Sequence, residues 1–186
     1  DAFDQLELRL DGVESSDTTV FQNQDPPQDQ QQLLINLHSQ GELQQAIEQA
    51  EVLLRQFPDS SVLHNICGAV YKGLGQLDKS IAAYINALAI KPDYAEGHYN
   101  LGNALKEQGK QNEAVEAYNK AIAIKPDFAM AFSNMGTAFQ EQGKLEKAIQ
   151  AFKQALSFKP DYAEGFYNLG NALKEQGKQN EAVEAY

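Results

Sequence analysis

The stretch Lys91–Tyr118 reads KPDYAEGHYNLGNALKEQGKQNEAVEAY, and it returns as Lys159–Tyr186 with a single change, His98 to Phe166. The second copy begins 68 residues after the first, which is two steps of 34. Prolines recur at this step of 34, at Pro58, Pro92, Pro126 and Pro160. A fixed period between about 20 and 50 residues is typical of stacked supersecondary units. The chain is therefore predicted to be a repeat protein.

Each period is predicted to hold two helices. In the period 95–128, apolar residues at helical spacing occupy Leu101–Leu105, and Gly109 interrupts the pattern. A second helical stripe covers Ala114–Ile122, and Pro126 ends it. We expect Gly109 to take the left-handed conformation that closes the first helix.

Two local patterns refine this prediction. Gly102 lies in the middle of the first helix, where glycine costs about 1 kcal/mol relative to alanine. Its recurrence indicates close approach of a neighbouring helix, with aromatic residues such as Tyr118 filling the space. Asp93 followed by Glu96 is typical of a capping box at the start of the first helix. Asp161 and Glu164 repeat that capping-box pattern.

These residues resemble the tetratricopeptide repeat (TPR) family, over about 27–186. The third period carries the family pattern at His98, Leu101, Gly102, Leu105, Ala114, Tyr118, Ala121 and Pro126. The resemblance implies an all-α fold, an α-solenoid of antiparallel helix pairs wound into a right-handed superhelix. We expect repeats at 27–60, 61–94, 95–128 and 129–162, and a truncated repeat at 163–186.

The fifth copy stops at Tyr186, inside its second helix. We therefore expect the sequence to be a piece of a longer protein. Its last repeat is predicted to expose apolar side chains and to favour self-association through that surface. The side chains predicted to be exposed there are Phe166, Leu169, Leu173 and Tyr186.

Charge and composition limit the classes of partner that the protein can have. The 186 residues carry 26 acidic and 15 basic side chains, for a net charge of −11. This balance argues against nucleic acid or an anionic membrane as a partner, because both require clustered Lys and Arg. No apolar run approaches the ~18 residues of a membrane span. Residues 1–26 are predicted to form an acidic, largely disordered segment or linker, and the protein is expected to be cytoplasmic.

No catalytic motif interrupts the repeats. The sequence lacks a glycine-rich loop after a strand, and it lacks HExxH and GxSxG patterns. Cys67 is the only cysteine, which excludes a disulfide framework and a multi-cysteine zinc site. We expect Cys67 to be a buried packing residue. The chain is therefore predicted to be non-catalytic, with no cofactor and no metal.

The family resemblance implies that first-helix residues not needed for packing line a concave groove. Asn100, Asn134 and Asn168 occupy the same position in three successive repeats. Each carboxamide offers donors and an acceptor, so a ladder of them could hold the backbone of an extended peptide. This arrangement is similar to the asparagine ladder of the O-linked N-acetylglucosamine transferase repeats. The groove residues predicted in this way are Tyr99, Asn100, Asn103, Lys106, Asn134, Thr137, Tyr167, Asn168, Asn171 and Lys174.

Two alternatives stay open at this stage. The asparagines could instead bond the backbones of neighbouring helices. The array is predicted to be a protein-interaction scaffold that binds an extended peptide or a partner helix. It could also be the substrate-docking arm of a larger enzyme, because bacterial proteins with similar repeats often continue into glycosyltransferase, sulfotransferase or oxygenase domains. A clamp for acidic C-termini is disfavoured, since the lysines that it needs are missing from the required positions.

Overall fold

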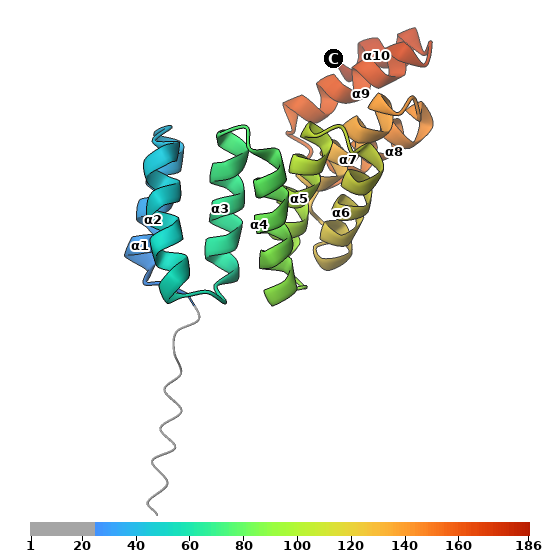
Figure 1. Ribbon diagram of the computed structural model, residues 1–186. Coiled ribbons are helices and arrows are strands. Elements are labelled where there is room, and N and C mark those ends of the chain that lie inside the picture. Colours follow the sequence, from blue (N-terminus) through green and yellow to red (C-terminus); the bar gives the residue numbers. More distant parts are fainter. Residues whose placement is uncertain (1–24) are drawn as a thin grey trace, which may run out of the picture.

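The computed structural model describes residues 25–186, which form ten helices and no strands (Figure 1). This result confirms the predicted all-α solenoid. The predicted N-terminal segment, apart from its last two residues, lies outside the described residues. The helices are α1 (Gln28–Ser39), α2 (Leu43–Gln56), α3 (Ser61–Gly73), α4 (Leu77–Ile90), α5 (Ala95–Glu107), α6 (Gln111–Ile124), α7 (Ala129–Glu141), α8 (Leu145–Phe158), α9 (Ala163–Glu175) and α10 (Gln179–Ala185).

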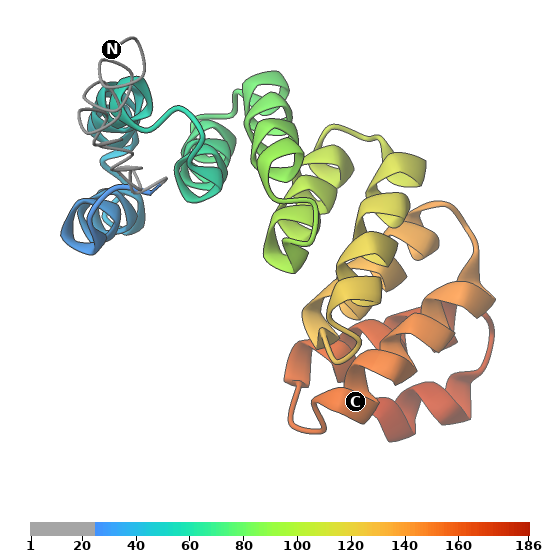
Figure 2. The same ribbon diagram turned by 90° about the horizontal axis from the view of Figure 1, so that it is seen from below.

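The helices follow one another along a curved array (Figures 1 and 2). Each helix packs against the next one in the chain. The odd-numbered helices also contact one another in turn, from α1 to α3 and on to α9. Successive even-numbered helices make no such contact within residues 25–186. The odd-numbered helices therefore form the inner face of the curve, and the even-numbered helices form the outer face.

Glycines close the first helix of every pair. Gly41, Gly75, Gly109, Gly143 and Gly177 have φ angles between +71° and +87°. This left-handed conformation disfavours a side chain, which explains why glycine recurs at the step of 34 residues. The expected role of Gly109 is confirmed.

A second set of glycines lets the two helices of a pair approach closely. A Cβ atom placed on Gly102 would lie 2.6 Å from a ring atom of Tyr118, and one on Gly136 would lie 2.7 Å from the ring of Phe152. Both rings are fully buried. The predicted contact between a mid-helix glycine and an aromatic ring is confirmed.

The predicted capping boxes are wrong. α5 begins after Tyr94 and α9 begins after Tyr162, and no side chain caps either helix. At both starts the tyrosine ring packs over a first-turn glycine instead, because a Cβ atom on Gly97 would lie 2.9 Å from the ring of Tyr94 and one on Gly165 would lie 2.9 Å from the ring of Tyr162. Only Ser60, before α3, acts as a side-chain cap among the helices in residues 25–186, and its Oγ accepts from the backbone N–H of Leu63 at 3.1 Å.

The prediction for the last repeat is correct in two positions and wrong in two. Phe166 and Tyr186 are exposed, whereas Leu169 and Leu173 are buried. Both leucines belong to one apolar cluster with Ile149 of α8 and residues of α10. The short α10 is therefore long enough to cover Leu169 and Leu173 of α9.

Raising the pH from about 8 to about 12 is expected to unfold the array. Burial, together with the negative charge of Glu51, raises the pKa of Cys67 to about 12. Burial also raises the pKa values of Tyr84 and Tyr118 above the usual value for tyrosine. In an unfolded chain these groups lose their protons near pH 8.5 and 10. The folded state then holds more protons than the unfolded state, so the free energy of unfolding falls as the pH rises through this range.

Circular dichroism and phenolate absorbance, followed together, measure this effect. Helix loss should coincide with a cooperative rise in phenolate absorbance from the buried tyrosines, Tyr84 and Tyr118. Tyr84→Phe should move that step to higher pH, because Phe152 fills the equivalent place against Gly136. Unchanged helicity after all eight tyrosines have ionised would contradict the prediction.

Candidate functional site

The predicted groove residues lie on three inner-face helices. α5 carries Tyr99, Asn100, Asn103 and Lys106, α7 carries Asn134 and Thr137, and α9 carries Tyr167, Asn168, Asn171 and Lys174. The three ladder asparagines are all partly accessible to solvent. The inner surfaces of α3, α5, α7 and α9 thus form one candidate site, which we call the inner groove.

Side-chain hydrogen bonds join the first part of the inner groove across repeats. Asn100 Nδ2 donates to Asn65 Oδ1 of α3 at 3.1 Å. Asn134 Nδ2 donates to Tyr99 OH at 3.2 Å and to Asn103 Oδ1 at 2.8 Å. The asparagines therefore bond neighbouring side chains, and no bond from them to a neighbouring backbone occurs within residues 25–186.

The second part of the inner groove is less connected. Asn168 makes no side-chain hydrogen bond within residues 25–186, and Thr137 Oγ1 donates to the backbone oxygen of Ser133 at 3.2 Å. Asn171 Oδ1 accepts from Tyr186 OH at 2.8 Å. The carboxamide of Asn168 is thus available to a ligand.

Charged residues run along the ends of the inner-face helices. Lys72 of α3 pairs with Glu107 of α5 at 3.4 Å, and Gln140 of α7 donates to Glu175 of α9 at 2.8 Å. Lys106 and Lys174 form no ion pair within the described part of the chain. Both lysines therefore stay unpaired, and each is followed in the chain by a glutamate, Glu107 or Glu175.

The two groove tyrosines differ in their surroundings. The ring of Tyr99 packs against Phe128 with 4.9 Å between ring centroids and against Tyr118 with 6.1 Å. Tyr167, its copy in the last repeat, is 60% exposed and lies beside Tyr186. Tyr99 is thus held in place, whereas Tyr167 offers an open aromatic surface.

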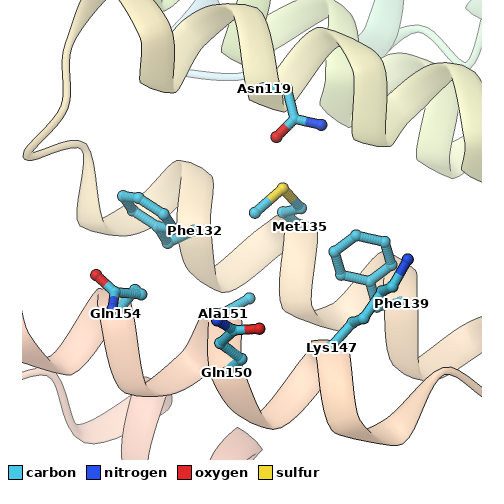
Figure 3. Close-up of a pocket in the computed structure, with 8 residues that line it drawn as sticks. All are labelled: Asn119, Phe132, Met135, Phe139, Lys147, Gln150, Ala151 and Gln154. Carbon is cyan, nitrogen blue, oxygen red and sulfur yellow. The ribbon is translucent and has the colours of Figure 1, made fainter.

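The outer face carries clefts that our sequence analysis missed. One of about 320 Å³ lies between α6 and α8, with Phe132, Met135 and Phe139 of α7 as its floor (Figure 3). Asn119 points into it from α6, and Lys147, Gln150 and Gln154 border it on α8. The sequence signal for this cleft was that the apolar side chains of α7 are larger than those of α5.

Asn65 and Tyr118 were also missed as groove residues. Asn65 lies 35 residues before Asn100. This separation is one residue longer than the 34-residue repeat, so the two asparagines do not occupy equivalent positions. Tyr118 was assigned to packing, yet its hydroxyl reaches Asn103 of the groove at 2.8 Å. In the sequence, this contact could have been inferred only because Tyr118 carries a hydroxyl and Asn103, on the first helix of the same pair, is polar.

The described residues do not bring metal-ligating side chains together. They contain no cluster of three or more His, Cys, Asp or Glu that could hold a metal ion. Cys67 is buried as expected, and its pKa of about 12 keeps the thiol protonated at neutral pH. No helix between residues 25 and 186 has both the length and the apolar character needed to cross a bilayer.

Comparisons with known proteins agree with this geometry. The family described as a TPR repeat matches residues 68–109, 102–143 and 138–177. A crystal structure of MamA is 25% identical, with a TM-score of 0.75 over 81% of this chain and 88% of that chain. MamA from Desulfovibrio magneticus RS-1, residues 41 to the end, is 20% identical, with a TM-score of 0.74 over 84% of this chain and 91% of that chain.

A structure of pilF from Pseudomonas aeruginosa is 21% identical, with a TM-score of 0.79 over 86% of this chain and 72% of that chain. At such identities these two named bacterial proteins share the fold alone with this chain. A search of curated protein sequences gave no match. The solenoid, with its inner and outer faces, is thus a fold that other solved proteins share.

Proposed function

Because this chain belongs to the TPR repeat family, whose members are protein-interaction modules, we propose that it binds an extended peptide or a partner helix in the inner groove without catalysing a reaction. The observation that carries the proposal is the row of Asn100, Asn134 and Asn168. These three carboxamides lie on one face at equal sequence spacing, and each is partly open to solvent. The row supports recognition of a repeating backbone more than recognition of one side chain.

The surroundings of the row support an extended occupant. The acceptor oxygens of Asn100 and Asn134 receive no hydrogen bond from the described residues, so they can receive N–H groups of a ligand. Tyr167 adds an exposed aromatic ring of the type enriched at interfaces. Lys106 and Lys174 provide positive charge for carboxylates or carbonyl groups along the edge.

Selection of short random peptides against the whole chain tests this proposal. The tightest nonapeptide is labelled, and its affinity is measured by fluorescence anisotropy. Changing Asn100, Asn134 and Asn168 together to alanine should weaken binding about tenfold or more, because a few residues near the centre of an interface carry most of its binding energy. Helicity should remain nearly unchanged.

A matched control replaces three exposed asparagines of the even-numbered helices with alanine. These are Asn86, Asn112 and Asn119. The control variant should bind the same peptide as tightly as the parent chain. Equal affinities for both variants, or the failure to select any binding peptide, would refute the proposal.

A further inference from the structure

We infer that Tyr118 sets the hydrogen-bond polarity in the middle of the inner groove, so that Asn134 can only accept a hydrogen bond there. The bound peptide must then present a free backbone N–H to Asn134, and proline is excluded at that position. This inference rests on the proposed function and adds a chemical requirement for its ligand.

The ring of Tyr118 is fully buried against Gly102. Its hydroxyl lies 2.8 Å from Oδ1 of Asn103. Burial, with a contribution from the nearby Tyr99 and Glu141, raises the pKa of Tyr118, so the hydroxyl stays protonated. A buried hydroxyl hydrogen needs an acceptor. A reversed Asn103 carboxamide would leave that hydrogen without one, so Oδ1 of Asn103 must face Tyr118.

The orientation of Asn103 then fixes the orientation of Asn134. Oδ1 of Asn103 accepts a second hydrogen bond, from Nδ2 of Asn134, at 2.8 Å. The same nitrogen donates to Tyr99 OH at 3.2 Å. A carboxamide nitrogen carries two hydrogens, and both are used. Only Oδ1 of Asn134 remains, and it stays in contact with solvent without a donor from the described residues.

The three ladder positions therefore differ in what they offer a ligand. Asn100 donates one hydrogen to Asn65 and keeps the other. Asn168 donates none to the described residues, so it can pair with both polar groups of a peptide unit. Asn134 alone is restricted to accepting. Proline has no backbone N–H, so a proline facing Asn134 would leave its oxygen buried without a partner.

The hydrogen bonds that run from Tyr118 through Asn103 to Asn134 form a relay, and the equivalent positions of other repeats can be compared with it. Tyr186 OH donates to Asn171 Oδ1 at 2.8 Å, which repeats the pair of Tyr118 and Asn103. Phe152 has no hydroxyl, and the residue in place of Asn103 is Thr137, which bonds its own helix instead. The two repeats that pair a tyrosine with an asparagine at these positions thus form the bond, and the repeat with Phe152 and Thr137 does not.

Side-chain amide NMR on the whole chain tests the relay without a ligand. The two hydrogens on Asn134 Nδ2 should exchange slowly with water in the parent chain, because both are bonded. Tyr118→Phe should speed their exchange, since Asn103 is then free to reverse. Tyr84→Phe is the matched control, because Ala69 stands in place of Asn103 in that repeat. Equal exchange in the parent and Tyr118→Phe chains would overturn the inference.

The selected nonapeptide tests the ligand requirement. Each residue in turn is replaced by alanine or by N-methylalanine, in which a methyl group replaces the backbone N–H hydrogen. At one central position N-methylation should weaken binding to the parent chain about tenfold, and to Tyr118→Phe about twofold or less. If N-methylation is tolerated throughout while the triple asparagine variant still loses binding, the inference fails and the proposed function stands. If neither change affects binding, both fail.

Discussion

Phe152→Ala is expected to lower the free energy of unfolding by about 3–5 kcal/mol. The ring is fully buried and shares an apolar cluster with Ile149, Leu169 and Leu173. It also fills the space that Gly136 leaves open on α7. Removing it loses the burial of the ring and leaves a cavity between two helices that cannot move together without disturbing the next pair. Urea unfolding followed by circular dichroism measures the loss.

Phe158→Ala on the same helix is the matched control. Phe158 is 45% exposed and stacks on Phe132 with 5.6 Å between ring centroids. Its removal should cost about 1 kcal/mol, the size of a single aromatic pair. Similar losses for the two variants would show that the glycine–aromatic contact is not the main source of stability between α7 and α8.

Gly136→Ala is expected to destabilise the array by about 1–3 kcal/mol, although alanine favours helix formation. The new methyl group would lie 2.7 Å from the ring of Phe152, which is too close for any pair of carbon atoms. That ring is fully buried and has no open space in which to move. The steric cost should therefore exceed the gain of about 1 kcal/mol in helix propensity.

Two further variants distinguish this explanation from a general effect of alanine. Gly73→Ala also adds a methyl group near the end of a helix, but its nearest neighbour is a methyl group of Leu43 at 3.0 Å, which can rotate away. That change should be neutral or slightly stabilising. Phe152→Leu should recover part of the stability of Gly136→Ala, as a coupled pair does in a double-mutant cycle. Independent, additive losses would contradict the steric explanation.

The sequence was sufficient to predict the solenoid because the residues that end its helices act through their own backbone conformation. Gly109 and its copies need the left-handed conformation, and Pro126 and its copies end helices, whatever surrounds them. The helix starts could not be predicted in the same way. Asp93 and Glu96 fit a local capping rule, but α5 begins after Tyr94 without a side-chain cap, and the ring of Tyr94 packs over Gly97. A Cβ atom on Gly97 would also lie 3.1 Å from Leu88 of α4, and such a tertiary contact is not part of a local rule.

The candidate site was also predictable from the sequence only in part. Helical spacing was enough to assign Asn100, Asn134 and Asn168 to equivalent faces, and their role in binding stays a prediction. Spacing could not show which hydrogens these side chains already use. That depends on neighbours in the preceding repeat, such as Asn65 for Asn100 and Asn103 for Asn134. Neither partner is related to its donor by the 34-residue step.

The succession of helices that touch only near neighbours also determines how the chain can acquire its structure. No hydrogen bond that a side chain makes within residues 25–186 joins residues more than 35 apart. Low contact order of this kind favours folding in microseconds to milliseconds. A ribosome adds about 5–20 residues per second, so each helix pair has all of its preceding partners before the next pair is synthesised. Folding can therefore proceed in step with translation, one repeat at a time.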